Sequence, residues 1–501
     1  MSSHRHKSVL RLAILTPVLM MAAFGCTVGP NFITPKAETP ASWIGSAVKA
    51  SSKDNQTSTV IASPMETDAW WLSFNDPILS SLIAQAAASN LDVQQAALRI
   101  AEARTQRQIA GAAQLPTLSG NSSYVRQRFS ETTAQGSLFG KIGSLGAGSG
   151  LGALSYPNPY DQFQIGFDAS WEPDLFGGIR RSIEAADANT EAAINDKNNA
   201  LVSLEGEVAR SYIDLRNTQQ KQTITQQNLD TQREILALAR QRFHSGLGMD
   251  VDVSNADAQV TSTQAQLPLL DRQATLDINQ LSQLLAREPG ALQSELEVVQ
   301  PVPNVPSEVR IGLPADLLRR RADIQSAEAR LHAATARVGV ATADLFPHIT
   351  FDASFGTQAG TFPGLVSWAS RFFNIGPSLQ LPIFDGGKLR ATVQLQNVQE
   401  KEAAVDYAQV VLGAVHEVEN ALVTYNTEQS RRVSLQETLI QNRNVLDLAR
   451  QRYKSGVTTF LEVLDAERTL QQTELSLADS TAAVSTDLVA LYEALGGGWK
   501  T

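Results

Sequence analysis

The chain has 501 residues, of which 18% are charged and 6% aromatic, and its formal net charge is −10. Its richness in Ala, Gln, Asn and Thr suits long helices better than a compact α/β enzyme, although composition alone does not exclude an enzyme. No basic patch stands out apart from Arg319 to Arg321, which lie inside an amphipathic run. Composition and charge therefore argue against a nucleic-acid partner, which would require a basic patch.

Residues 1–25 have the pattern of an export signal. Three basic residues lie within the first eleven positions, an apolar run follows from Leu12 to Phe24, and Gly25 precedes Cys26. The apolar run is too short to span a membrane as a mature helix. Cys26 is the only cysteine, and a lone thiol after a small residue is typical of a bacterial lipid-acceptor site. We expect a lipid on Cys26; the alternative is an ordinary cleaved signal with an incidental free cysteine.

The chain contains two copies of one unit. The stretch LALARQRFHSG, which ends at Gly246, returns as LDLARQRYKSG, which ends at Gly456, at an offset of 210. The sequence that starts at Leu91 likewise aligns with the one that starts at Ala322, at an offset of 231. Periods of this length are far longer than those of solenoid repeats. We therefore predict a duplicated unit.

Both copies are predicted to hold the same elements in the same order: a helix that ends before a proline, two strands of alternating polarity, a long helix and a return helix. The first copy, 78–290, has them at 78–114, 116–130, 160–174, 177–246 and 251–286. The second copy, 314–495, has them at 314–344, 347–356, 372–384, 386–456 and 460–495. The alternation at 116–130 is weak, and we predict this strand mainly from its place in the repeat. Pro268 predicts a kink or break in the first return helix.

The two long helices lack internal proline and would each measure roughly 100 Å. A helix of this length needs lateral support from other helices, as in a coiled coil. Each one ends at a glycine, Gly246 or Gly456, which is a common helix terminator. The repeated phrase thus predicts the tip of a helical hairpin, and the chain has two such tips.

Four strands of about ten residues have the length of membrane-spanning β-barrel strands. Four strands cannot close a barrel, and an open sheet edge in lipid leaves backbone groups unpaired. Several chains must then combine: three would supply about twelve strands and two about eight. The alternative is a soluble domain with half-buried strands. The export signal, the expected lipid and the Gly-rich or Pro-rich insertions at 130–159 and 356–371 favour the membrane.

The sequence has no recognisable motif for catalysis, nucleotide binding or metal binding. The glycine run at 143–152 lacks the helix and acidic partner of a dinucleotide site, and GSLFGK at 136–141 is too short for a phosphate loop. The histidines at 244, 332, 348 and 416 lack the spacing of metal ligands, and no serine or cysteine stands in a nucleophile context. We expect no enzymatic activity, metal or cofactor other than the lipid.

Several longer stretches resemble a known family. They are GCTVGPNFITP, WWLSFNDPILSSLIAQA, GLPADLLRRRADIQSAEARLHAATARVGVATADLFPHI and RYKSGVTTFLEVLDAERTL. These resemble the TolC-like outer-membrane factors of Gram-negative efflux pumps, in the NodT-type lipoprotein branch that works with resistance-nodulation-division transporters. The resemblance covers nearly the whole mature chain. One departure is Ala322, where the family usually has proline.

The resemblance implies an α+β membrane protein, a homotrimer with a twelve-stranded outer-membrane β-barrel continued by a periplasmic α-helical barrel. A mixed equatorial belt would be built from 26–77 and 291–313, with 496–501 as a C-terminal tail. The implied function is a passive, lipid-anchored duct that exports drugs or other small toxic molecules. Its implied partners are outer-membrane lipid, a periplasmic adaptor and an inner-membrane resistance-nodulation-division transporter.

The resemblance also implies a gate at the periplasmic end, where acidic residues just past each turn face the lumen. The matching positions are Asp252, Asn255, Glu462 and Asp465. Three-fold symmetry would turn Glu462 and Asp465 into acidic rings that attract cations; the alternative is that Asp465 only supplies a favourable helix-start charge.

An arginine that pairs across the tips in some relatives is replaced here by Thr458, so closure is expected to depend on Tyr453, Asp250 and packing. The tip residues resemble the family's docking sites for the adaptor. They are Ser245, Gly246, Ser455 and Gly456.

Three other functions remain open at this point. The chain could be the outer-membrane duct of a type I protein secretion system, which usually lacks a lipid cysteine. It could also be a coiled-coil lipoprotein that bridges the envelope without transport, which the alternating strands, the duplication and the acidic tips oppose. A soluble enzyme is the weakest option.

Overall fold

The computed structural model describes residues 27–36, 40–44, 58–61, 63, 69–130, 132–134, 137 and 159–499. The export signal and Cys26 lie outside the described residues. The chain divides into two compact units, and both draw on both sequence copies. The first unit comprises the N-terminal segment to Ile33, 104–188 and 332–402, and the second comprises 34–103, 189–331 and 403–501. The sequence copies are therefore not separate compact bodies, because corresponding segments of the two copies pack together.

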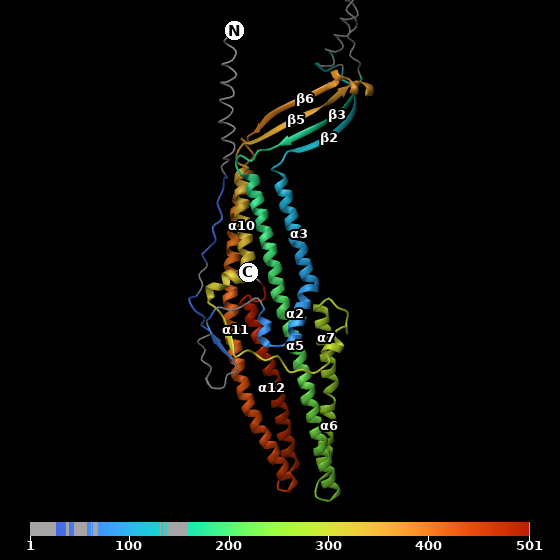
Figure 1. Cartoon of the computed structure of the whole chain (residues 1–501), viewed down its shortest axis with the longest axis vertical. Coiled ribbons are helices and arrows are strands. Elements are labelled where there is room, and N and C mark those ends of the chain that lie inside the picture. The colour runs from blue at the N-terminus through green and yellow to red at the C-terminus, as the bar shows by residue number, and fades with distance from the viewer. Residues whose placement is uncertain are drawn as a thin grey trace, which may run out of the picture. The chain divides into compact units, whose positions relative to one another are not determined.

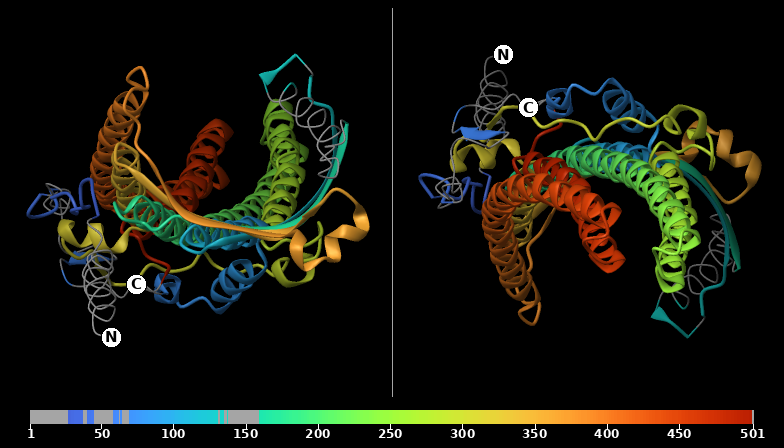
Figure 2. Two further views of the ribbon diagram at one scale, coloured as in Figure 1. Left: turned by 90° about the horizontal axis from the view of Figure 1, so that it is seen from above. Right: turned by 90° about the horizontal axis from the view of Figure 1, so that it is seen from below.

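The first unit contains one antiparallel sheet with the strand order β2-β3-β5-β6. Its strands are β2 (Thr117–Gln127), β3 (Tyr160–Trp171), β5 (His348–Ala359) and β6 (Arg371–Gln380). Figure 2 shows that this sheet is curved. The β3–β5 pair joins the two sequence copies in a single sheet. Strand β6 ends four residues before the expected boundary at 384, close to Pro382, which has no N–H group to continue the pairing.

The two faces of this sheet differ in polarity. On one face the rings of Phe167 and Phe355 stand 5.4 Å apart, and those side chains remain about half exposed. On the other face Ser170 Oγ donates to Asp352 Oδ1 at 2.7 Å, and Thr350 and Ser378 share a hydroxyl hydrogen bond of 2.6 Å. The alternation seen in the sequence is thus realised as one apolar and one polar surface.

Helices make up most of the described chain. They are α2 (Pro77–Ser89), α3 (Leu91–Ala112), α5 (Gly178–His244), α6 (Asp250–Gln264), α7 (Leu267–Leu284), α8 (Gln293–Leu296), α9 (Leu317–Arg320), α10 (Ala322–Ala343), α11 (Lys388–Lys454) and α12 (Phe460–Ala494). The 3-10 turns in the described residues are η2 (Trp70–Phe74), η3 (Pro314–Asp316), η4 (Phe362–Val366) and η5 (Trp368–Ser370). Within the described residues, no helix combines the length and the apolarity needed to cross a membrane.

The first helix of each copy is interrupted, whereas we expected uninterrupted helices over 78–114 and 314–344. In the first copy Asn90 separates α2 from α3, and its Oδ1 accepts hydrogen bonds from the backbone N–H groups of Asp92 and Val93 at 2.8 and 3.2 Å. Such a side-chain cap favours a new helix start over continuation. In the second copy Arg321 separates α9 from α10 and stands 231 positions after Asn90, the offset already found for Leu91 and Ala322.

The helices of the second unit include two hairpins. Helix α5 returns as α6, and α11 returns as α12 (Figure 1). The first return path breaks between Gln264 and Leu267, just before Pro268, as the proline led us to expect. The second return helix, α12, is continuous over 35 residues.

A small parallel sheet joins two distant segments of the second unit. Strand β1 (Thr59–Ile61) pairs with β4 (Glu308–Arg310). Nearby in sequence, the indole Nε1 of Trp43 donates to the carbonyl of Gly312 at 3.2 Å. These contacts connect the segments 26–77 and 291–313, which we assigned to a common belt.

Candidate functional site: the two helix tips

The two hairpin tips have the same backbone design. At the end of α5, Gly246 N–H donates to the Phe243 carbonyl at 2.9 Å and Leu247 N–H donates to the Arg242 carbonyl at 2.9 Å. At the end of α11 the corresponding bonds measure 3.0 and 2.9 Å. This pair of bonds defines a Schellman motif, which requires a residue with positive φ. Gly246 has φ 72° and Gly456 has φ 74°, so the repeated glycine meets a backbone requirement.

The serines before these glycines also behave alike. The hydroxyl groups of Ser245 and Ser455 each donate to a carbonyl of their own helix, Gln241 or Gln451, at 2.9 Å. Both serines are exposed. An added Cβ at Gly246 would meet open space. The candidate adaptor-docking residues therefore form two exposed turns of equal shape.

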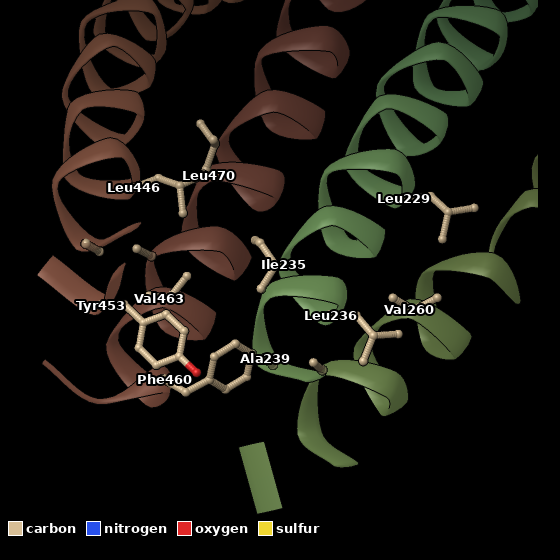
Figure 3. Close-up of a cluster of buried hydrophobic side chains, with 13 residues drawn as sticks. Leu229, Ile235, Leu236, Ala239, Val260, Leu446, Tyr453, Phe460, Val463 and Leu470 are labelled. Atoms are coloured by element: carbon tan, nitrogen blue, oxygen red, sulfur yellow. The ribbon is translucent and has the colours of Figure 1, made fainter. Parts of the chain in front are cut away.

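An apolar cluster lies behind the tips and joins the two hairpins; we call it the tip cluster (Figure 3). Its buried members come from all four helices, α5, α6, α11 and α12. They are Leu229, Ile235, Leu236, Ala239, Ala256, Val260, Leu446, Ala449, Tyr453, Phe460, Val463, Ala466 and Leu470. In Figure 3, α12 stands between α11 and α5, so the second hairpin contacts the first through α12. Burial of these side chains holds the two hairpins together.

Tyr453 belongs to this cluster. Only 3% of the residue is exposed, and its ring packs against Phe460 at a centroid distance of 5.5 Å (Figure 3). Burial raises the pKa of the Tyr453 hydroxyl, the carboxylate of Asp252 raises it further, and Arg242 opposes the shift. The structure thus brings Tyr453 of the second copy close to Asp252 of the first, two residues that we assigned to the gate.

Arg242 connects the two tips directly. Its Nη1 donates to the carbonyls of Tyr453 and Lys454 at 2.7 and 3.2 Å, and its Nη2 donates to the carbonyl of Leu247 at 3.3 Å. Its guanidinium carbon also stands 4.7 Å from the centre of the Tyr453 ring. A cation at the end of α11 satisfies carbonyls that have no partner within the helix, and it is favourable at the negative end of the helix dipole. One side chain of the first hairpin therefore caps the second.

The predicted acidic gate residues occupy the starts of the return helices. Asp250 and Asp252 lie in the first turn of α6, and Glu462 lies in the first turn of α12. Asp465 comes after that first turn, so the helix-start alternative that we considered for Asp465 fits Glu462 better. Glu462 and Asp465 are both exposed, as is Asn255 of α6.

A buried carboxyl lies deeper in the second hairpin. Only 4% of Glu467 of α12 is exposed, and Gln232 of α5 and Arg450 of α11 lie beside it. Burial raises the pKa of Glu467 to about 7, although Arg450 and Gln232 both lower it. This group is therefore partly protonated near neutral pH.

Two of these residues, Arg242 and Glu467, were not singled out from the sequence. Arg242 stands in the repeated ARQR phrase and is equivalent to Arg452, which is exposed. The sequence therefore did not show that Arg242 contacts the other tip. Glu467 occupies a position of the apolar spacing of α12, but we did not distinguish it from the exposed acidic residues of the same helix. A polar residue at a position of the apolar stripe was the available signal.

No group of three or more His, Cys, Asp or Glu side chains in the described part of the chain is arranged to hold a metal ion. The tips instead present backbone turns, exposed acids and one cross-hairpin arginine.

Comparison with known proteins gives consistent results. The sequence profile of the family described as outer membrane efflux protein matches residues 82–287 and 313–497. Nodulation protein T of Rhizobium leguminosarum bv. trifolii is 32% identical over 97% of both chains. The solvent efflux pump outer membrane protein SrpC of Pseudomonas putida is 31% identical over 95% of this chain and 96% of its own. The solved structure of the outer-membrane channel OprN, 33% identical, superimposes with a TM-score of 0.83 over 95% of this chain and 100% of that chain.

Proposed function

Because the chain belongs to the outer membrane efflux protein family, we propose that it is the passive outer-membrane duct of a tripartite efflux pump of the resistance-nodulation-division type. The fold is that of outer-membrane efflux channels. The observation that carries the proposal is the four-stranded sheet with one apolar and one polar face, in the same chain as two matched helical hairpins. A duct needs both a lipid-facing wall and a wet interior.

The edges of the sheet support assembly from several chains. Within the described residues, strands β2 and β6 each pair on one side only. In lipid, the free sides of these strands would leave backbone groups unpaired, at several kcal/mol each. A homotrimer would join β6 of one chain to β2 of the next and close about twelve strands into a barrel. The paired hairpins of three chains would form the periplasmic helical barrel in the same way.

Arg242 supports a gate at the tips. It ties the first hairpin to the end of α11 through Tyr453 and Lys454. Opening would separate the hairpins and break these bonds. The exposed carboxylates of Glu462 and Asp465 would form acidic rings around the three-fold axis and favour the entry of cations. The exposed Gly246 and Gly456 turns would receive the periplasmic adaptor, whose docking would supply the energy for separation.

The anchor and the cargo follow from the same assignment. Cys26 would carry the covalent lipid that secures the chain to the outer membrane. The name of SrpC connects that relative to solvents, which supports a cargo of small toxic molecules for this chain. The energy for transport would come from the inner-membrane partner.

The test is electrical and uses the purified full-length chain in planar bilayers. We expect cation-selective channels with low conductance from an assembly of about three chain masses. Glu462→Ala and Asp465→Ala should reduce cation selectivity, and unchanged selectivity in both variants would remove the acidic rings. A folded monomer that forms no channels and has no affinity for bilayers would overturn the duct itself. Mass spectrometry of the mature N-terminus would test the lipid on Cys26.

A further inference from the structure

The polar face of the sheet carries Phe372 of β6, an apolar aromatic residue that the alternation does not explain. The register places Phe372 of β6 opposite Gly356 of β5, and Gly356 opposite Gly166 of β3. The same row continues to Asn121 of β2. Phe372 thus shares its face with Asn121, and its neighbour Phe373 shares the apolar face with Phe355.

The two glycines of this row are required by close strand contact. A Cβ on Gly356 would stand 2.3 Å from the carbonyl oxygen of Ile165 and 2.7 Å from Gly166 Cα, and a Cβ on Gly166 would stand 2.9 Å from the carbonyl oxygen of Phe355. No larger residue fits at either position without a shift of the backbone. The row therefore lacks side chains on two adjacent strands.

The Phe372 ring fills part of this gap. A Cβ on Gly166 would meet Phe372 Cζ at 3.5 Å, so the ring extends from β6 across β5 toward β3. The ring remains half-buried, whereas Phe373 on the opposite face is 82% exposed. Covering glycine backbone with an aromatic ring is a known way to support a sheet. Here the ring also presents an apolar surface on a mainly polar face.

Two carboxylates share that face in the adjoining rows. Asp168 lies one row away from Phe372 on the same face and Asp352 two rows away. Asp168 receives a hydrogen bond from Asn121, and Asp352 receives hydrogen bonds from Ser170 and Thr350 at 2.7 and 3.2 Å. An aromatic ring beside fixed negative charges is suited to flat molecules that carry a positive charge.

We propose that Phe372 is a cargo-contacting residue of the barrel lumen, where three copies form an aromatic band that stacks aromatic cations during passage. This inference rests on the proposed duct, because the polar face lines a lumen only when the barrel closes. The band binds weakly, which slows flat molecules without trapping them. The glycine row lets the ring lie flat against the wall.

The experiment measures block of the ion current through the full-length channel by ethidium, an aromatic cation, and by tetrapropylammonium, a cation without a ring. Both are added on the barrel side. Phe372→Ser should raise the half-blocking concentration of ethidium about two- to tenfold, the range expected for loss of an aromatic contact, and leave that of tetrapropylammonium unchanged. Phe373→Ser, which alters the opposite face, should leave both values at the wild-type level.

A second variant guards against a folding defect. Phe372→Leu keeps an apolar side chain over the glycines. It should still raise the half-blocking concentration of ethidium, because the aromatic ring is lost. Equal ethidium block in the wild type and in both Phe372 variants would overturn the aromatic band while the duct stands. Absence of any conductance in the wild type would instead refute the duct.

Discussion

The two helix tips share one backbone and differ in their surroundings. Both end in the same pair of hydrogen bonds around a glycine of positive φ. Phe243 of the first tip is 41% exposed, whereas its equivalent Tyr453 in the second tip is 3% exposed. The duplicated sequence thus repeats the backbone turn, but the equivalent aromatic side chains are buried to different extents.

A second pair of equivalent positions, farther from the turns, shows the same difference in burial. In the first hairpin Arg240 and Asp257 form an ion pair of 3.1 Å, and both side chains are 55% exposed. The equivalents at the offset of 210 are Arg450 and Glu467 in the second hairpin, where the glutamate is buried. The order of the helices accounts for the burial of Glu467, because α12 stands between α11 and α5 and has a neighbour on each side (Figure 3). Equivalent residues of the two copies are therefore buried to different extents, although the phrase around them is repeated.

The largest expected effect comes from the aromatic pair. Tyr453→Ala should lower the free energy of unfolding by about 3–5 kcal/mol, because it removes a fully packed ring from the tip cluster. The matched Phe243→Ala should lower it by less than about 1 kcal/mol, since that ring is already partly in water. Thermal unfolding of the purified channels in detergent would measure both. Similar losses would refute the difference in burial.

The buried carboxyl gives a pH-dependent contrast. The folded-state pKa of Glu467 is about 7, above the ordinary value of 4.5. Its neutral form therefore contributes stability that is fully present below pH 4.5 and is lost as the pH rises to about 7. Glu467→Gln should remove this loss and stabilise the protein at pH 8 by up to about 3 kcal/mol, with little change at pH 4.5.

The control for this experiment is Asp257→Asn in the exposed pair of the first hairpin. We expect it to alter stability by less than about 1 kcal/mol at either pH, because exposed ion pairs contribute little. The quantity to compare is the difference in melting temperature between variant and wild type across this pH range. A Glu467→Gln difference that is constant with pH would show that the carboxyl does not titrate there.

The cross-hairpin arginine should have a smaller effect on stability and a visible effect on conductance. Arg242→Ala removes charge-assisted hydrogen bonds to Tyr453 and Lys454, at about 1.5–3 kcal/mol. It should also raise the resting conductance of the channel in bilayers. The matched Arg452→Ala, at an exposed position, should change neither quantity. Equal conductance in all three proteins would exclude Arg242 from closure.

The smallest expected effect on stability concerns the glycine turn that both tips share. Gly246→Ala and Gly456→Ala should each destabilise their turn by about 1 kcal/mol, because both place a side chain at positive φ. Hydrogen exchange at the amides of Leu247 and Val457 would then be faster by about fivefold in the respective variants. Clearly unequal acceleration would mean that the two turns are not equivalent.

The sequence predicted the tips well because a repeat with glycine at its end reports local backbone geometry. It predicted neither the break at Asn90 nor that at Arg321, since both residues sit within continuous helical periodicity and the break at Asn90 depends on a side-chain cap. It could not distinguish Arg242 from Arg452, because their different partners come from the packing of α5 against the second hairpin. Phe372 fits the apolar composition of β6, and only the register places its ring over two glycines.

The open edges of the sheet have a consequence for how much channel a cell obtains from a given amount of chain. If three copies must meet before β2 and β6 find partners, the yield of finished channel rises more steeply than in proportion to synthesis when chains are scarce. Modest changes in expression would then produce disproportionate changes in export capacity. Chains that have not assembled would remain accessible to chaperones and proteases.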